Sequence, residues 1–175
     1  MRTDRWTIRK RLIMISAVAI AGLAALALDS LYTLRSSMLQ DRKEKTQVLV
    51  EVAGGVIARF HELARKGMLS DEEARHGAAE TLRHMRYAGG EYFFILDTQH
   101  RFVMHPLKPE LEGTSGAEMR DPNGKPLIRE IVRTALASGP GGLVEYVFAR
   151  AGSDQPAPKI SYAAQFKPWG WVYGT

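Results

Sequence analysis

The sequence predicts an α+β protein: an N-terminal transmembrane helix, a long helix plus a second helix, and then an antiparallel sheet of about five strands with an inserted helix. Three observations indicate this order. An uncharged run begins at Leu12, apolar residues at helical spacing follow it, and short aromatic and β-branched runs between glycine-rich turns fill the remainder. The 175 residues suffice for one compact domain and a membrane segment, but not for two full domains.

The first element is an apolar segment that follows a basic cluster. No residue from Leu12 to Leu28 is charged, and the apolar character resumes after Asp29, so residues 12–34 have about the ~20-residue length that spans a bilayer. Residues 1–11 hold five basic side chains and one acidic side chain. Segments rich in positive charge tend to stay on the cytoplasmic side of the membrane. This cluster therefore predicts that residues 1–11 form a cytoplasmic tail and that residues 35–175 are extracytoplasmic.

Three further observations qualify this topology and limit the functions. The stretch Ala25-Leu26-Ala27 is similar to a signal cleavage site, so a secreted domain is the alternative to an uncleaved anchor, and both alternatives export the domain. The net charge of +5 comes mostly from the N-terminal cluster, which argues against nucleic-acid binding. The chain contains no cysteine, and this excludes disulfides, thiolate metal sites and thiol catalysis.

Two helices are predicted before the first strand. Apolar residues at spacings of three and four place one stripe on a helix that runs toward Gly67, the expected residue after its end; they are Leu49, Val52, Val56, Phe60 and Leu63. Gly54-Gly55 inside this helix predicts close packing or a bend. The segment 70–73 matches a capping box and starts a second helix, whose apolar positions are Ala74, Ala78, Leu82 and Met85.

The part of the chain from about residue 88 to 175 contains the strands. Short aromatic and β-branched runs predict strands at 92–96, 102–105, 143–148, 159–166 and 169–175. A turn-rich stretch, 108–125, is expected to lie over the sheet. A helix follows it, with a buried face formed by Leu127, Ile128, Ile131, Val132, Ala135 and Leu136. Strands joined by short turns pair antiparallel, which gives a PAS-like α+β layout.

From about Val48 to Thr175 the sequence resembles the single Cache domain (type 2) of bacterial methyl-accepting chemotaxis receptors. The resemblance is carried, in order, by Arg86-Tyr87, Tyr92-Phe93-Phe94-Ile95, Met104-His105-Pro106, Leu111-Glu112-Gly113, Asp121-Pro122-Asn123-Gly124-Lys125, Tyr146, Lys159-Ile160-Ser161-Tyr162 and Pro168-Trp169-Gly170-Trp171-Val172. It departs from the family pattern at Phe148, where a tryptophan is usual, and at Ala149-Arg150-Ala151, where a proline-containing turn is common. Both departures bear on pocket size.

The resemblance implies an extracytoplasmic sensor in the inner membrane that binds a small carboxylate such as acetate, propionate, pyruvate or lactate. Receptors of this kind act as homodimers and pass the signal to a cytoplasmic domain on a longer chain or on a partner. The chain therefore reads as a fragment of a longer receptor or as a natural short form. The output can be chemotaxis, a histidine kinase or a nucleotide cyclase, and the sequence does not choose among these or name the acid.

A buried carboxylate needs a cation and several hydrogen-bond donors to replace the water that it loses. The candidate ligand-binding residues are Arg86, Tyr87, Tyr92, His105, Tyr146, Lys159 and Tyr162. Arg86 stands at a helix-to-strand junction and Lys159 opens a strand, so either can point into a cavity; the alternatives are a surface ion pair for Arg86 and a solvated Lys159. His105 can equally be a strand-end histidine. Alternation places Tyr92 and Phe94 on one sheet face, in the core or in a pocket.

Other patterns do not support an enzyme or a metal site. His76, Glu80 and His84 share a helical face, but neighbouring arginines favour a solvated surface over zinc. No zincin, nucleophile-elbow, phosphate-loop or dinucleotide motif is present, and no cofactor is expected. Trp169 and Trp171 are expected in the core or at the membrane-proximal edge. The leading hypothesis is a ligand-sensing receptor module; the alternatives are a secreted periplasmic solute-binding Cache protein and a ligand-free anchor or assembly domain.

Overall fold

A computed structural model describes residues 8–137, 139–149 and 155–175. The chain divides into two compact units, Met1–Arg42 and Lys43–Thr175, and helix α1 (Ile8–Arg65) contributes to both. Arg2 and Arg5 of the basic N-terminal cluster, and Arg150-Ala151 of the segment that departs from the family pattern, lie outside the described residues.

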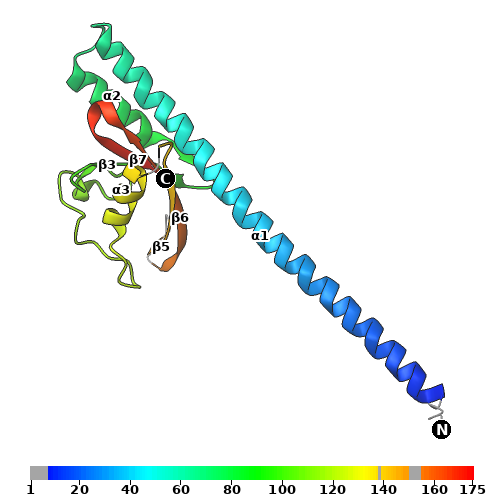
Figure 1. Cartoon of the computed structure of the whole chain (residues 1–175). Coiled ribbons are helices and arrows are strands. Elements are labelled where there is room, and N and C mark those ends of the chain that lie inside the picture. Colours follow the sequence, from blue (N-terminus) through cyan, green and yellow to red (C-terminus); the bar gives the residue numbers. More distant parts are fainter. Residues whose placement is uncertain (1–7, 138, 150–154) are drawn as a thin grey trace. The chain divides into compact units, whose positions relative to one another are not determined.

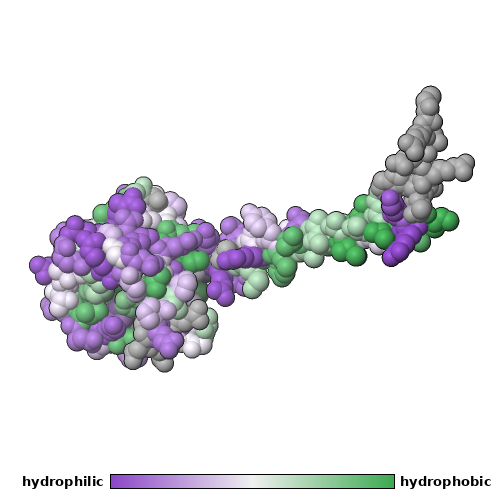
Figure 2. Space-filling model, turned by 90° about the horizontal axis from the view of Figure 1, so that it is seen from below, coloured by the Kyte–Doolittle hydropathy of each residue, from purple (hydrophilic) through white to green (hydrophobic). Residues whose placement is uncertain are grey.

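In the first unit, helix α1 presents large apolar side chains that no other described segment covers. Leu12, Ile15, Val18, Leu23 and Leu28 are each more than half exposed. Figure 2 shows green apolar residues along this helix and purple charged residues beside its N-terminal end. Within the described ranges, α1 is the single helix that is long and apolar enough to cross a membrane, and none of its apolar window is buried. An apolar band of this size needs a non-aqueous partner.

In the second unit, α1 buries a face that is rotated from the predicted stripe. Val50, Ala53 and Ile57 are fully buried, whereas Val52 is 54% exposed, so its place in the stripe was predicted wrongly. The predicted stripe and the buried set both have helical spacing and overlap in sequence. The docking of α1 onto the sheet determines which of the two is buried. The helix ends as predicted: Gly67 has a φ of +70°, and the Met68 amide donates to the Leu63 carbonyl at 3.0 Å.

Helix α2 (Asp71–His84) begins with the predicted capping box. The Ser70 hydroxyl accepts from the Glu73 amide at 3.1 Å, and the Glu73 carboxylate accepts from the Ser70 amide at 2.8 Å. These bonds satisfy donors that the first helical turn leaves unpaired. The buried positions Ala74, Ala78 and Leu82 confirm the predicted face.

The strands form one five-stranded sheet and one small hairpin. The hairpin pairs β1 (Arg86–Tyr87) with β2 (Glu91–Tyr92). The sheet has the order β4-β3-β7-β6-β5, with every neighbouring pair antiparallel, which confirms the predicted layout (Figure 1). Its strands are β3 (Phe94–Asp97), β4 (Phe102–Met104), β5 (Gly142–Ala149), β6 (Pro156–Phe166) and β7 (Trp171–Gly174). The predicted first strand is thus divided at Phe93.

The sheet has two differently covered faces. Helices α1 and α2 cover one, hereafter the helix face, whose cluster includes Ile57, Leu82, Ile95, Trp171 and Tyr173. Helix α3 (Leu127–Ala137) covers the other, hereafter the α3 face (Figure 1), whose cluster includes Phe94, Leu96, Ile131, Ala163 and Val172. Consecutive strand residues point to opposite faces, which is why Trp171 and Tyr173 belong to one cluster and Val172 to the other. Leu136, expected on the buried face of α3, is 45% exposed.

Candidate functional site

A cavity of about 30 Å³ lies on the α3 face, larger than the roughly 10–15 Å³ that one water molecule requires. It is lined by Tyr92, Phe94, Phe102, His105, Leu111, Met119, Leu127, Ile128, Ile131, Tyr146 and Phe148. Tyr92 and Phe94 therefore share one face, as their alternation predicted. Eight of these eleven side chains are hydrocarbon or thioether, so the cavity is mostly apolar.

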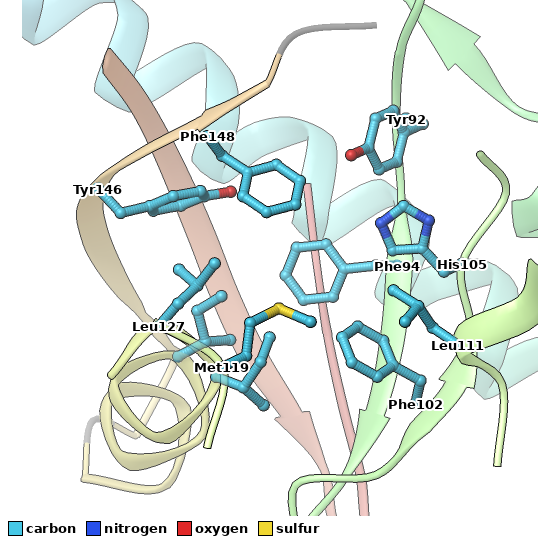
Figure 3. A pocket seen from close by; sticks show the side chains of 11 residues that line it. Tyr92, Phe94, Phe102, His105, Leu111, Met119, Leu127, Tyr146 and Phe148 are labelled. Atoms are coloured by element: carbon cyan, nitrogen blue, oxygen red, sulfur yellow. The ribbon is translucent and has the colours of Figure 1, made fainter. Parts of the chain in front are cut away.

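Three polar side chains from separate elements converge on this cavity (Figure 3). Tyr92 comes from β2, Tyr146 from β5, and His105 follows the end of β4. The Tyr92 and His105 rings lie in contact, with centroids 5.1 Å apart. A mostly apolar cavity with a few placed polar groups is the usual composition of a small-molecule site.

His105 faces the cavity as a neutral ring. Burial lowers its pKa to about 4, with the positive charges of Lys108 and Lys159 contributing. The Lys108 amide donates to Nδ1 of the ring at 3.0 Å. Because Nδ1 accepts that bond, the hydrogen of the neutral imidazole is on Nε2. His105 can therefore offer an N–H donor without adding positive charge.

The two tyrosines also stay neutral. Burial raises the pKa of Tyr92 to about 12 and raises the pKa of Tyr146 further. The Tyr146 hydroxyl is hydrogen-bonded to the Ser161 hydroxyl at 2.8 Å, and Ser161 is almost completely buried. Both phenols are therefore available as donors to a bound acceptor.

Lys159 is not one of the residues that line the cavity, but it supplies positive charge beside one of them, Tyr92. It stands directly opposite Tyr146 in the β5–β6 register, and directly paired residues of an antiparallel sheet point to the same face. Its Nζ lies 5.1 Å from the centroid of the Tyr92 ring, and its side chain is only 13% exposed. Its nearest carboxylate is Glu91, at 3.2 Å. The structure thus places the cation beside the tyrosine that lines the cavity.

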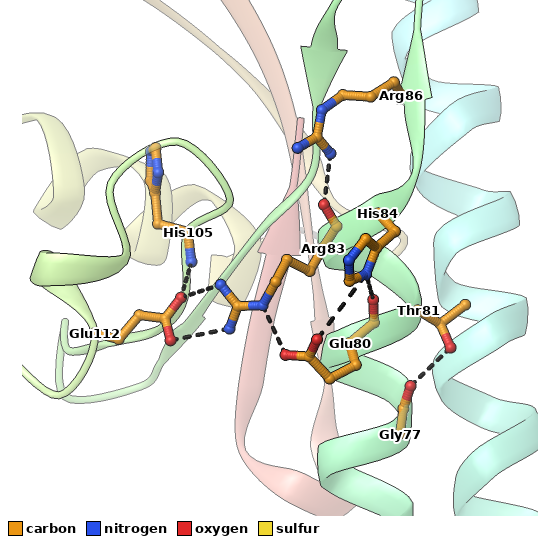
Figure 4. Close-up of polar contacts among 8 residues, drawn as sticks. All are labelled: Gly77, Glu80, Thr81, Arg83, His84, Arg86, His105 and Glu112. Carbon is orange, nitrogen blue, oxygen red and sulfur yellow. Dashed lines mark hydrogen bonds and ion pairs between the residues drawn. The ribbon is translucent and has the colours of Figure 1, made fainter.

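Three of the predicted site residues lie elsewhere. The Arg86 guanidinium is exposed and donates to the main-chain carbonyl of Met85 at 2.8 Å and to that of Arg83 (Figure 4). The Tyr87 hydroxyl is hydrogen-bonded to that of Thr175, and its ring packs against Phe93. The structure does not bring these two side chains to the cavity.

Tyr162 also belongs to the other side of the sheet. It is buried in the cluster of the helix face, together with Ala164, whereas Ala163 belongs to the α3 face. Lys159 and Tyr162 are three residues apart on one strand, so alternation directs them to opposite faces. The spacing in the sequence already contained this signal.

Sequence reasoning did not assign several cavity residues. Ser161 does not line the cavity itself but is hydrogen-bonded to Tyr146, which does; it is two residues beyond Lys159, so strand alternation could have found it. Leu111 and Met119 come from the irregular segment between β4 and α3, and no periodicity locates them. Phe148, noted above as a departure from the family pattern, does line the cavity.

A polar bridge positions the segment that carries His105 (Figure 4). The Glu112 carboxylate accepts from the guanidinium of Arg83 on α2 at 2.6 and 2.9 Å, and from the His105 amide at 2.9 Å. The arginine lowers the pKa of the Glu112 carboxyl. This two-bond pairing between Arg83 and Glu112 fixes one wall of the cavity to helix α2.

A second, open groove of about 550 Å³ lies between α2 and the sheet. Both of its arginines are already engaged: Arg75 with Asp71 at 2.6 Å, and Arg83 with Glu80 and Glu112. In the described part of the chain, no three His, Asp or Glu side chains gather as a metal site requires. The smaller cavity is therefore the better-built candidate.

The fold and the cavity together define a PAS-like sensor module: an antiparallel sheet with helices on one face and a small pocket on the other. The chain belongs to the family described as Single Cache domain 2, whose pattern matches residues 38–175.

Two curated relatives are similar over nearly the whole chain. The methyl-accepting chemotaxis protein McpP of Pseudomonas putida is 36% identical over 169 residues, which are 97% of this chain and 31% of that protein. The sensor histidine kinase MctS of Rhizobium johnstonii is 30% identical over 152 residues, 87% of this chain and 32% of that protein. The chain thus spans about a third of the length of these relatives, and they are receptors with different outputs.

Solved structures agree with this assignment. A periplasmic sensor domain of a chemotaxis protein is 47% identical, with a TM-score of 0.75 over 78% of this chain and 94% of that one. A Cache chemosensory domain described for its carboxylic acid recognition is 32% identical, with a TM-score of 0.75 over 79% of this chain and 94% of that one.

Proposed function

We propose that this chain is the extracytoplasmic ligand-sensing region of a membrane receptor and that its cavity binds a small carboxylate. The observation that carries the proposal is the pairing of a mostly apolar cavity with one poorly exposed cation, Lys159, at its tyrosine-lined side. A carboxylate leaving water needs such a cation and several donors. The similar Cache domain described for carboxylic acid recognition supports the same ligand class.

In the proposed complex, Lys159 neutralises the carboxylate. The hydroxyls of Tyr92 and Tyr146 and the Nε2–H of His105 donate to its oxygens, while Phe94, Phe102 and Phe148 contact its short carbon chain. All three donors are neutral, so they add direction without excess positive charge. The small volume restricts the ligand to a few non-hydrogen atoms, as in acetate, propionate, pyruvate or lactate.

For the membrane arrangement, we propose that residues 1–11 are cytoplasmic, residues 12–34 span the inner membrane once, and residues 35–175 are extracytoplasmic. The exposed apolar band on α1 and the basic residues before it support this orientation. A periplasmic reporter fused after Thr175 should be active. Activity only from a cytoplasmic reporter would contradict the orientation.

We further propose that the receptor is a homodimer and that it signals through a cytoplasmic domain on a longer chain or a partner, as its receptor-type relatives suggest. Val48 and Val52, exposed one helical turn apart on α1, support a second copy as the partner of this helix. Sedimentation of the full chain in detergent should give a dimer.

The binding proposal is tested by thermal unfolding of the full chain in detergent with acetate, propionate, pyruvate and lactate, and with the matching amides as uncharged controls. An acid present at 100 times its dissociation constant should stabilise the protein by about 2.7 kcal/mol, a shift of several degrees. The Lys159→Met variant should bind at least about tenfold more weakly.

Arg86→Ala is the matched control, because it removes a cation whose guanidinium is exposed and bonds to the main-chain carbonyls of Arg83 and Met85. It should bind like the wild type. Loss of binding in Arg86→Ala but not in Lys159→Met would transfer the charge role to Arg86, as the sequence expectation had it. Equal stabilisation by acids and amides would reject a carboxylate site, and no stabilisation by any acid would favour the ligand-free anchor domain. A mature N-terminus after Ala27 would favour the secreted solute-binding alternative.

A further inference from the structure

The cation proposed for ligand binding already has a carboxylate partner within the chain. Lys159 Nζ lies 3.2 Å from Glu91 Oε2, and the two side chains are 13% and 34% exposed. The pair therefore lies between a fully solvated surface contact and a buried ion pair, where the attraction is stronger than in open water. A ligand carboxylate that approaches Lys159 meets a negative charge in the same place.

Glu91 lies outside the main sheet, so its side chain can leave Lys159 without breaking a hydrogen bond of that sheet. It belongs to the β1–β2 hairpin, which has only two residue pairs and is separate from the five-stranded sheet. The connecting residues Ala88, Gly89 and Gly90 all have positive φ values, of 41°, 83° and 130°. A two-stranded hairpin of this length has little stability of its own. The Glu91 side chain is therefore held mainly by its contact with Lys159.

The charges around the cavity favour replacement of the Glu91 carboxylate at Lys159 by the ligand carboxylate. An ammonium has three donor hydrogens, so its geometry admits two acceptors, but two carboxylates on one lysine leave a net negative charge in a poorly hydrated place. His105 is neutral and does not offset that charge. Lys108 also lowers the pKa of His105. Its Nζ lies 5.3 Å from the centroid of the Phe148 ring, so this second cation is beside a different wall of the cavity from Lys159.

We propose that Glu91 is an internal counter-ion that competes with the ligand carboxylate for Lys159, so that it sets the affinity of the pocket and is displaced when an acid binds. This inference rests on the proposed function of the cavity. The energetic consequence is that binding an acid costs the Glu91–Lys159 contact, and removal of the Glu91 charge raises affinity.

The test is a titration of the full chain with acetate, propionate, pyruvate and lactate, comparing the wild type with Glu91→Gln. The variant keeps the shape of the side chain and removes its charge. Its dissociation constant for the acids should fall about two- to fivefold, the range expected for loss of a partly exposed ion pair. Glu91→Asp, which keeps the charge on a shorter side chain, should change affinity in the same direction by less.

Two controls separate competition at Lys159 from a general charge effect. Glu145→Gln removes an acidic residue from an ion pair of the same length, 3.2 Å to Lys43, and should leave affinity unchanged. In a Lys159→Met background, Glu91→Gln should give no gain, because the two carboxylates then have no shared cation.

The outcomes distinguish this inference from the proposed function. If the wild type binds none of the four acids, the carboxylate site itself is rejected. If the wild type binds an acid but Glu91→Gln binds it equally or more weakly, the counter-ion role is overturned and the site stands. If Glu91→Gln does not fold, a Glu91→Asp variant that binds more weakly than the wild type overturns the inference in the same way.

Discussion

The helix face and the α3 face of the sheet are built from alternating residues of the same strands, yet the mostly apolar cavity lies on the α3 face, whereas an open groove lined largely by charged side chains lies between α2 and the sheet. On the helix face, α1 and α2 lay regular rows of side chains onto Ile95, Trp171 and Tyr173. On the α3 face, a short helix shares the cover with the irregular segment between β4 and α3. The difference between the two covers accounts for the difference in packing.

The irregular segment must satisfy its own main-chain polar groups, which a helix does internally. The Asp121 carboxylate shows how: it accepts from the amides of Asn123 and Lys125 at 2.9 Å and from that of Val147 at 3.1 Å. These bonds tie the segment to β5 and fix its course. Side chains such as Met119 are then placed by the course of the loop, and Met119 borders the cavity. The regular cover supports stability, and the irregular cover leaves room for a ligand.

The largest expected effect is the loss of stability when a buried side chain of α1 is removed from the helix face. Ile57→Ala removes a fully buried side chain from α1 and should lower the free energy of unfolding by about 2–5 kcal/mol. Arg59→Ala, on the same helix at an exposed position, should change it by no more than about 0.5 kcal/mol. Chemical denaturation of the full chain in detergent measures both. Equal losses would show that the two sides of α1 are not differently packed.

The second expected effect concerns the α3 face and is a loss of stability at low pH caused by His105. Its pKa is about 4 in the folded chain and about 6.5 when unfolded, so between these values the unfolded state binds the extra proton. Stability is therefore greatest above pH 6.5 and is lost as the pH falls. From pH 7 to pH 5 this one group should remove about 2 kcal/mol.

Denaturation at the two pH values measures the loss, with His105→Asn as the control. The asparagine side chain can still accept the bond that Nδ1 receives from Lys108, but it does not titrate. The variant should lose about 2 kcal/mol less than the wild type over the same interval. Identical slopes would mean that His105 is not buried as a neutral ring.

The smallest expected effect compares two adjacent glycines of α1. A Cβ at Gly54 would collide with the hydroxyl of Tyr173, whereas one at Gly55 would meet nothing within 4 Å. Gly54→Ala should therefore destabilise the protein by about 1 kcal/mol, because overpacking outweighs the helix preference of alanine. Gly55→Ala should stabilise it by about 0.5–1 kcal/mol. Thermal denaturation of both variants gives the signs, and a gain for both would refute the close packing at Gly54.

Most elements of the fold could be predicted because each has a local physical cause. The capping box from Ser70 to Glu73 and the left-handed Gly67 are set by hydrogen bonds within a few residues. Trp169 and Trp171 are both buried, in agreement with the core position expected for them, although Trp169 lies in a short 3-10 helix before β7 and not in the strand predicted over 169–175. Site residues were harder to predict, since a cavity joins segments that are distant in sequence. Tyr92, His105 and Tyr146 do line it, whereas Arg86 and Tyr162 do not.

The sequence by itself determined the element types, the antiparallel sheet and the membrane-length apolar helix, because periodicity, caps and turn residues act locally. Only the tertiary structure decided which side of α1 is buried. Val50 and Val52 each belong to a set of residues at helical spacing, and the docking of α1 onto the sheet buries the set that contains Val50. The tertiary structure also decided which cation lies near the cavity. Lys159 is directed there by its register opposite Tyr146, whereas the Arg86 guanidinium bonds to nearby main-chain carbonyls although Arg86 is paired with Tyr92. Strand pairing thus fixes the direction of Lys159, and composition does not encode it.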